Sequence, residues 1–293
     1  MKKENLAYVL VCITAMIWAT GAALSKLVLA EIDSLQFLMF VTLFAFAGML
    51  AAVLVTRKAG IIRKYKPRDY LVFSYMGFIG MFFYLFLFYS SLAIMRAQET
   101  VAVNYLWPIM VVIFASVILK ERPTIRKLSG ILISFMGVIV VITGGNPLSI
   151  QLSSLEGTLM AMAGAALYGL FSVLSKKHNY DKLTSMMFYC LFAFIYAFAS
   201  ALIFSSVPAV SLSQLAVMSW VGAFVNGLGI SLWLLALKYG DTAKIANIIY
   251  ITPFMALVYI YFLVGEEILA SSVIGLAGII AGNLIQQTRK NSG

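Results

Sequence analysis

Tyrosines, tryptophans and asparagines stand inside long apolar stretches of this sequence, where each polar group needs a specific partner. Their types suit non-covalent recognition of a small molecule. Aromatic rings contact its apolar part, while amides and phenolic hydroxyls hydrogen-bond its polar end. We therefore predict a substrate-binding cavity. The candidate lining residues are Trp18, Tyr84, Asn104, Tyr105, Trp107, Tyr168, Asn226, Trp233, Asn247 and Tyr250.

The depth of these residues in their apolar stretches favours a cavity for some of them. Trp18 and Trp107 lie near the middle, too deep for the aromatic belt at a membrane surface. Trp107 also precedes Pro108, which frees a backbone carbonyl that needs another partner. The alternative role is packing between helices. For Asn226 and Asn247 the two roles stay equally open, because a buried amide needs a partner in either case.

Catalytic and metal-binding groups are scarce. His178 is the one histidine, and the two cysteines, Cys12 and Cys190, lie far apart in separate apolar stretches. No His or Asp cluster is placed to hold a metal or activate water, and nucleotide-binding glycine motifs are missing. We therefore expect neither an enzyme nor a metal or other cofactor.

Few charges lie near the predicted cavity. Glu99 is a candidate for proton coupling, although a solvated glutamate at a helix start is an equally good interpretation. A weakly charged cavity suits net-neutral zwitterions better than inorganic ions or phosphorylated metabolites. Pro108 and Pro253 are candidate hinges, because each removes one helix hydrogen bond; the alternative is a static kink.

The elements that position these residues are membrane-spanning helices. Of the 293 residues, 62% are hydrophobic and 11% charged, and the mean hydropathy is +0.99. So apolar a chain cannot cover a water-soluble surface, and its solvent is a lipid bilayer. Apolar runs predict an all-α integral membrane protein with ten helices, near 6–29, 34–56, 70–95, 98–119, 126–143, 156–176, 183–205, 213–237, 242–264 and 270–288.

The basic residues predict the orientation of these helices. With the amino terminus inside, only Lys26 and Arg96 of the 21 Lys and Arg fall on the outer side. The cytoplasmic bias of basic loops therefore places both termini in the cytoplasm. The same distribution explains the net charge of +10 without nucleic acid, because the basic residues occupy short loops and no DNA-binding motif.

The chain also matches itself in two halves. A shift of 145 positions aligns five identical pairs: Tyr105 with Tyr250, Pro108 with Pro253, Glu121 with Glu266, Gly130 with Gly275 and Gly137 with Gly282. We predict two five-helix repeats, 1–145 and 146–293. Because five is odd, the second repeat enters the membrane from the opposite side, and substrate is expected between the halves.

Proline in the fourth helix, a glutamate just after it and a glycine-spaced fifth helix, all present twice, resemble the EamA family of the drug/metabolite transporter superfamily. The run from Glu99 to Pro108, with its Asn-Tyr-Leu-Trp-Pro end, resembles aromatic amino-acid exporters of the YddG type. This resemblance implies a ten-helix basket in a bacterial inner membrane, with a cavity lined by helices 1, 3, 4, 6, 8 and 9. It also implies export of aromatic and other neutral amino acids.

One departure from the family concerns the second helix, where many members carry an arginine and this chain reads Leu38-Met-Phe-Val-Thr42. Roles of that arginine cannot be transferred. Other substrates such as drugs or nucleosides, import in place of export, and a monomer or a homodimer all stay open. The expected partners are thus a small-molecule substrate, the lipid bilayer and, through coupling, protons.

Overall fold

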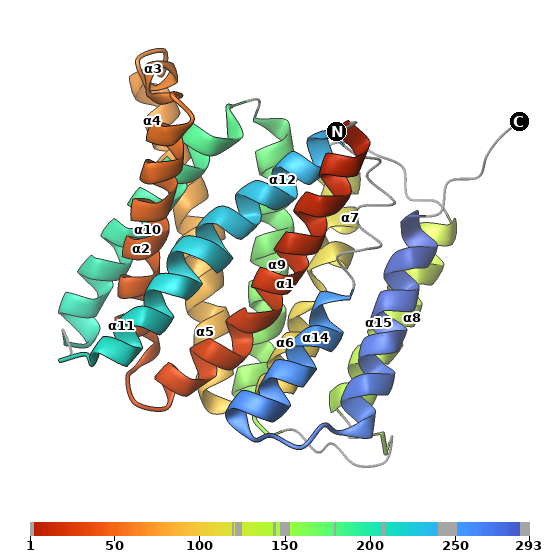
Figure 1. Cartoon of the computed structure of the whole chain (residues 1–293). Coiled ribbons are helices and arrows are strands. Elements are labelled where there is room, and N and C mark those ends of the chain that lie inside the picture. Colours follow the sequence, from red (N-terminus) through yellow and green to blue (C-terminus); the bar gives the residue numbers. More distant parts are fainter. Residues whose placement is uncertain are drawn as a thin grey trace, which may run out of the picture.

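The structure of the protein is a computed structural model. It describes residues 3–118, 120, 125–142, 145–146, 153–178, 180–206, 209–239 and 251–287. In these ranges the chain forms a bundle of helices (Figure 1). The elements are α1 (Lys3–Leu29), α2 (Ser34–Val55), α3 (Ala59–Ile62), α4 (Pro67–Gly77), the π-helix η1 (Phe78–Phe83), α5 (Tyr84–Ile94), α6 (Ala97–Asn104), α7 (Trp107–Ile118), α8 (Ile125–Ile142), α9 (Leu155–Lys177), α10 (Lys182–Phe204), α11 (Leu212–Ser219), the π-helix η2 (Trp220–Gly229), α12 (Ile230–Tyr239), α14 (Thr252–Tyr259), the π-helix η3 (Ile260–Val264) and α15 (Ala270–Gln287).

Seven helical stretches in the described ranges are long and apolar enough to cross a bilayer. Shorter apolar helices, Ser129–Val141, Thr252–Val264 and Ala270–Gly282, fall in the other three stretches that the sequence predicts to span. The first part of the predicted span 242–264 lies outside the described residues. The all-helical prediction is confirmed for the described chain, whereas ten crossings in two inverted repeats stay a prediction.

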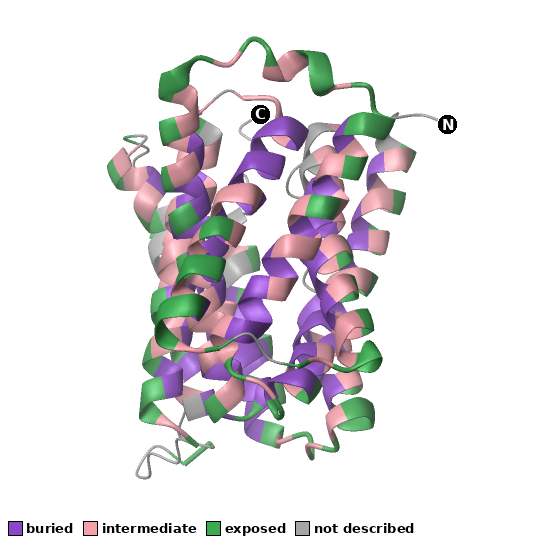
Figure 2. Cartoon of the chain, turned by 90° about the vertical axis from the view of Figure 1, so that its left-hand side faces the viewer, coloured by how far each residue is buried: buried purple, intermediate pink, exposed green. Residues whose placement is uncertain are grey.

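The outer surface of the bundle is apolar. Large side chains such as Val55, Phe204 and Leu212 are 83%, 77% and 84% exposed. Figure 2 shows exposed residues at both ends and on outward faces, with buried residues toward the interior. An apolar surface of this kind is stable in lipid rather than in water, which agrees with the hydropathy of the chain.

Several helices begin at a side chain that caps their first turn. The Asp33 carboxylate accepts hydrogen bonds from the backbone N–H groups of Leu35 and Gln36, at 2.8 and 2.9 Å. Ser154 accepts from Gly157 N at 3.0 Å at the start of α9. Such caps satisfy donors that have no partner inside the helix, so the sequence fixes these boundaries locally.

The fourth apolar stretch is broken, where the sequence predicted one continuous helix over 98–119. α6 ends at Asn104 and α7 begins at Trp107. The backbone turns through Tyr105 and Leu106, and Leu106 N donates to Val103 O, three residues back, at 3.0 Å. Pro108 explains the break, because it has no N–H to bond the carbonyl four residues earlier.

α8 and α15 pack face to face and form a pair at one side of the bundle (Figure 1). Glycines make their close approach possible: a Cβ on Gly137 would lie 2.5 Å from Gly275 O, and one on Gly282 would lie 2.3 Å from Gly130 O. Ser134 Oγ also donates to the Ile279 carbonyl at 2.9 Å. The glycines that match between the predicted repeats thus lie at one helix contact.

The start of α1, the end of α15 and one basic loop share an end of the bundle. α1 begins, and α15 ends, at the end of the bundle that also carries α3 (Figure 1). The segment around α3 is the basic stretch between Arg57 and Arg68. An even number of crossings brings both ends of a chain to one side.

Candidate functional site

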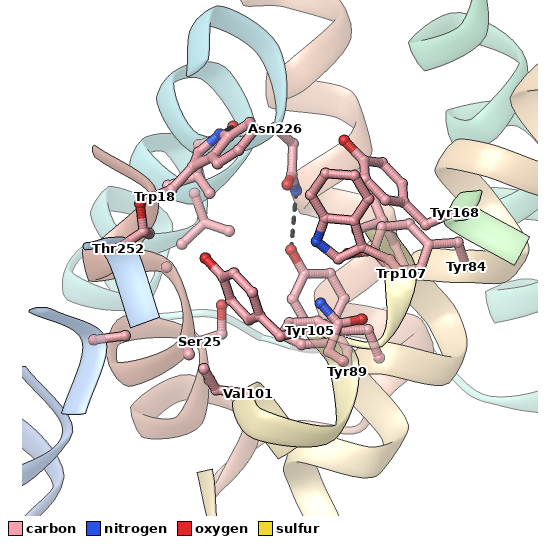
Figure 3. A pocket seen from close by; sticks show the side chains of 18 of the residues that line it. Trp18, Ser25, Tyr84, Tyr89, Val101, Tyr105, Trp107, Tyr168, Asn226 and Thr252 are labelled. Atoms are coloured by element: carbon pink, nitrogen blue, oxygen red, sulfur yellow. Dashed lines mark hydrogen bonds between the residues drawn. The ribbon is translucent and has the colours of Figure 1, made fainter. Parts of the chain in front are cut away.

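A cavity of about 130 Å³ lies in the middle of the bundle. Its lining comes from α1, η1, α5, α6, α7, α9, η2, α12 and α14, so both predicted halves contribute. It brings together seven of the ten predicted binding residues: Trp18, Tyr84, Asn104, Tyr105, Trp107, Tyr168 and Asn226. Figure 3 shows these aromatic and amide side chains gathered around the space.

The remaining predicted residues lie elsewhere. Trp233 is not in the lining; its ring packs against Trp18, with 6.1 Å between the ring centroids. Asn247 and Tyr250 lie outside the described residues. Of the predicted hinges, Pro253 lines the cavity at the first turn of α14, and Pro108 follows the break between α6 and α7.

One wall of the cavity is aromatic. The centroid of the Tyr168 ring lies 4.8 Å from that of Tyr84 and 5.2 Å from that of Trp107. The contact with Trp107 is edge-to-face, with an interplanar angle of 86°. These rings come from α5, α7 and α9 and lie together in Figure 3. Offset and edge-to-face pairs stabilise such a cluster and leave flat faces for an apolar ligand group.

Trp18 is oriented by the π-helix η2. Its indole Nε1 donates to Val225 O at 3.1 Å. Gly229 makes room for the ring, since a Cβ there would lie 2.5 Å from Trp18 Nε1. Val225 and Asn226 of η2 also line the cavity. π-Helical turns are frequent at functional sites, and here one sets the position of an aromatic side chain.

Asn226 makes a hydrogen bond that joins the two predicted halves. Its Nδ2 donates to the Tyr89 hydroxyl at 2.9 Å, and both side chains are buried. Tyr89 lines the cavity, as do Ser25 and Thr252, and none of these three is among the predicted binding residues. In the sequence, each of these three residues is a polar group within an apolar stretch. That pattern is shared by residues that pack between helices, so it did not identify them as lining residues.

The described lining of the cavity contains no Asp, Glu, Lys or Arg. Lys26, beside the lining residue Ser25, donates from Nζ to the carbonyls of Leu92 and Met95, at 2.7 and 2.8 Å. The ammonium therefore caps the end of α5, where the helix dipole favours a cation. The described side chains that line the cavity are therefore neutral, and they are aromatic, aliphatic or polar.

Glu99 lies in the first turn of α6 and is 7% exposed. Its carboxylate accepts a short hydrogen bond from Ser153 Oγ. It is absent from the described lining, so the structure separates this candidate for proton coupling from the aromatic wall.

Glu266 caps the same helix from the second half of the chain. Its Oε1 accepts from Ala97 N at 2.9 Å, and its Oε2 lies 3.5 Å from Gln98 N. The Gln98 side chain bonds the backbone of Glu267 and Leu269, at 2.8 and 3.0 Å. Together these bonds tie the segment before α15 to the start of α6.

A second connection between the halves lies near α3. Lys58 Nζ lies 2.6 Å from Asp181 Oδ2. Burial acts to raise the pKa of Asp181, but hydrogen bonds from Lys58 and Thr184 N outweigh it, so this pKa lies below its ordinary value. The ionised carboxylate therefore contributes to stability near neutral pH.

Comparisons with known proteins find similarity to transporters. A model of the EamA-like transporter family matches residues 5–143 and again residues 155–286. The uncharacterized transporter YyaM of Bacillus subtilis is 26% identical over 248 residues, which cover 82% of this chain and 81% of YyaM. The aromatic amino acid exporter YddG of Ancylobacter novellus is 27% identical over 184 residues, 61% of this chain and 63% of YddG.

A solved crystal structure has the same fold. It superposes with a TM-score of 0.71 and 19% sequence identity, and the match covers 97% of both chains. Similarity over nearly the whole length shows that the helices are arranged alike.

Proposed function

Since this chain belongs to the EamA-like transporter family, we propose that it exports small metabolites, namely aromatic and other neutral amino acids. Membership makes the protein a transporter and not an enzyme. The proposed setting is the bacterial inner membrane, and the proposed route is the central cavity.

The uncharged, aromatic lining of that cavity is the observation that supports this substrate class. A zwitterionic amino acid has no net charge and needs no buried counter-ion, whereas a phosphorylated metabolite needs Arg or Lys. The cavity volume of about 130 Å³ resembles an engineered apolar cavity of about 150 Å³ that holds one benzene molecule. The cavity thus has the size that suits a small aromatic ligand.

Movement of the two halves opens the cavity to each side of the membrane in the proposed mechanism. The chain crosses the membrane ten times as two inverted repeats, with both termini in the cytoplasm, and the cavity opens alternately to each side. The shared end of α1, α15 and the basic α3 segment supports this orientation (Figure 1). Flexing occurs at Pro253, in the first turn of α14, and at the break between α6 and α7 before Pro108.

The direction of transport rests on the relative from Ancylobacter novellus, which is named an aromatic amino acid exporter. For this chain, export means that substrate enters the cavity from the cytoplasm and leaves on the outer side. The amino-acid gradient alone drives it unless Glu99 couples a proton.

The test is transport of labelled Phe, Trp, Thr and Met by the purified full-length chain in liposomes. A nucleoside and a polyamine serve as controls, and each flux is measured with and without a pH gradient. Saturable flux of Phe and Trp is the expected result, and cells loaded with labelled Phe should lose it faster when they express the protein. Flux of the nucleoside or polyamine alone would refute the amino-acid assignment.

A further inference from the structure

Three buried polar oxygens in the described lining of the cavity, Ser25 Oγ, Asn104 Oδ1 and Thr252 Oγ1, make no hydrogen bond of standard geometry. The Ser25 side chain lies near the Tyr89 hydroxyl and the Asn104 side chain near the Tyr84 hydroxyl. Ser25 is 1% exposed and Thr252 is 4% exposed. Buried polar atoms are nearly always bonded, so three oxygens that lack such a bond in one cavity indicate a position for bound ligand atoms.

These oxygens come from three helices that contact one another, α1, α6 and α14. Ser25 and Thr252 lie on one side of the cavity, and the rings of Tyr84, Trp107 and Tyr168 lie on the other (Figure 3). The cavity thus has a polar side and an aromatic side. A ligand that fits it carries a compact polar group at one end and an apolar or aromatic group at the other.

The chemistry of the oxygens selects the polar group. Asn104 Oδ1 is an acceptor only, and the hydroxyls of Ser25 and Thr252 can also accept. A primary ammonium carries three N–H donors and no acceptor, so it matches a lining that offers acceptor oxygens. A carboxylate carries no donor and would leave Asn104 Oδ1 unpaired.

The protein's own nearby cation does not occupy this position. Lys26 follows Ser25 in the sequence, but its Nζ is bonded to the carbonyls of Leu92 and Met95 at the end of α5. Its charge is therefore compensated at a helix end, and the three oxygens remain available to a ligand.

We propose that Ser25, Asn104 and Thr252 form the subsite for the protonated amino group of the substrate, with its side chain against the aromatic wall. The assignment rests on the proposed function and adds which end of the amino acid is recognised. Because α1 and α6 belong to the first predicted half and α14 to the second, the bound ammonium joins the two halves.

The test compares two truncated probes on the wild-type chain. Phenethylamine keeps the amine and lacks the carboxylate, whereas 3-phenylpropionate keeps the carboxylate and lacks the amine. Binding to the purified chain in nanodiscs is followed by quenching of tryptophan fluorescence, because Trp18 and Trp107 line the cavity. The Kd of phenethylamine is expected to be at least about tenfold lower than that of 3-phenylpropionate. One charge-assisted hydrogen bond has an effect of this size.

Variants then locate the subsite. Ser25→Ala and Thr252→Val are each expected to weaken phenethylamine binding about tenfold, since a hydrogen bond to a charged group is lost. Thr252→Ser keeps the hydroxyl and should restore binding. Thr42→Val is the matched control, because the buried Thr42 hydroxyl bonds Leu38 O at 2.7 Å in α2, away from the cavity.

The outcomes separate this inference from the proposed function, which is tested by amino-acid flux. Equal binding of both probes, or equal binding by the valine and serine variants at position 252, would overturn the ammonium subsite even if Phe is transported. Phenethylamine binding that depends on Ser25 and Thr252, without amino-acid flux, would support the subsite and overturn amino-acid export. Absence of binding by every probe would overturn the subsite.

Discussion

Tyr89→Phe tests whether the hydrogen bond between the halves stabilises this conformation. The substitution removes one oxygen and keeps the ring, which packs edge-to-face on Phe37 with 4.8 Å between centroids. The bond it deletes is the 2.9 Å contact from Asn226 Nδ2 to the Tyr89 hydroxyl. Tyr89 is 2% exposed and Asn226 is 7% exposed, so the amide left behind has little access to bulk water.

The expected cost follows from this burial. An orphaned buried donor costs about 1–3 kcal/mol, but hydrogen bonds between membrane helices average about 0.6 kcal/mol and reach about 1.7 kcal/mol in double-mutant cycles. Asn226 lines the cavity, where water can replace part of the lost bond. We therefore expect Tyr89→Phe to lower the free energy of unfolding by about 1 kcal/mol, roughly a fivefold change in the equilibrium constant.

The assay is reversible unfolding of the purified chain in mixed micelles, followed by circular dichroism, as a double-mutant cycle with Asn226→Ala. A coupling energy near 1 kcal/mol between the two substitutions is expected. The control cycle uses Tyr196→Phe, whose hydroxyl bonds Ser74 Oγ at 2.5 Å outside the cavity, and it should show no coupling to Asn226. An unchanged unfolding energy for Tyr89→Phe, with zero coupling, would refute the role of this bond.

Three further perturbations test the site and its supports. Trp107→Ala removes a ring of the aromatic wall and should lower kcat/KM for Phe flux by about tenfold, with the amount of protein in the membrane unchanged on immunoblots. Trp220→Ala, which changes a residue outside the lining, should leave kcat/KM unchanged. Equal flux in both variants would remove Trp107 from the site. Glu266→Gln weakens the charged cap on α6 and should lower the free energy of unfolding by about 0.5–2 kcal/mol. Glu267→Gln alters an exposed side chain and should have little effect. Similar losses of stability in both variants would argue against the cap. Asp181→Asn removes the ion pair near α3 and should lower the free energy of unfolding by up to about 1 kcal/mol at pH 7. Because the pKa of Asp181 is lowered in the folded state, this difference from wild type should vanish as the pH falls below about 3.9 and through the folded pKa. A difference that grows in acid would contradict the role of the ion pair.

Helix boundaries were predictable because they depend on local chemistry. The predicted span 34–56 corresponds to α2, Ser34–Val55, and the Asp33 cap that starts it is visible in the sequence. The break inside 98–119 was missed as a boundary, although Pro108 was recognised as the residue that removes a helix hydrogen bond. A proline can kink a helix or divide it, and the surrounding packing determines which occurs.

The cavity was predictable only in part. Trp107, Tyr168 and Asn226 were expected in it and line it, but Trp233 packs behind Trp18 and Tyr89 was not expected. The π-helix η2, which precedes Trp233, contributes to the displacement of that residue from the lining. Each π-turn accommodates an extra residue, which rotates the following side chains by about 100° relative to a regular helical pattern.

The sequence alone determined that this protein folds in a bilayer as apolar helices, where most of them begin and end, and which family it resembles. These features follow from hydropathy, loop charge and capping, which act over a few residues. The tertiary structure decided which polar groups meet. Asn226 reaches Tyr89 across 137 positions of sequence, and Ser25 comes to share a cavity with Thr252, because the packing of whole helices, and not any local pattern, sets where their side chains lie.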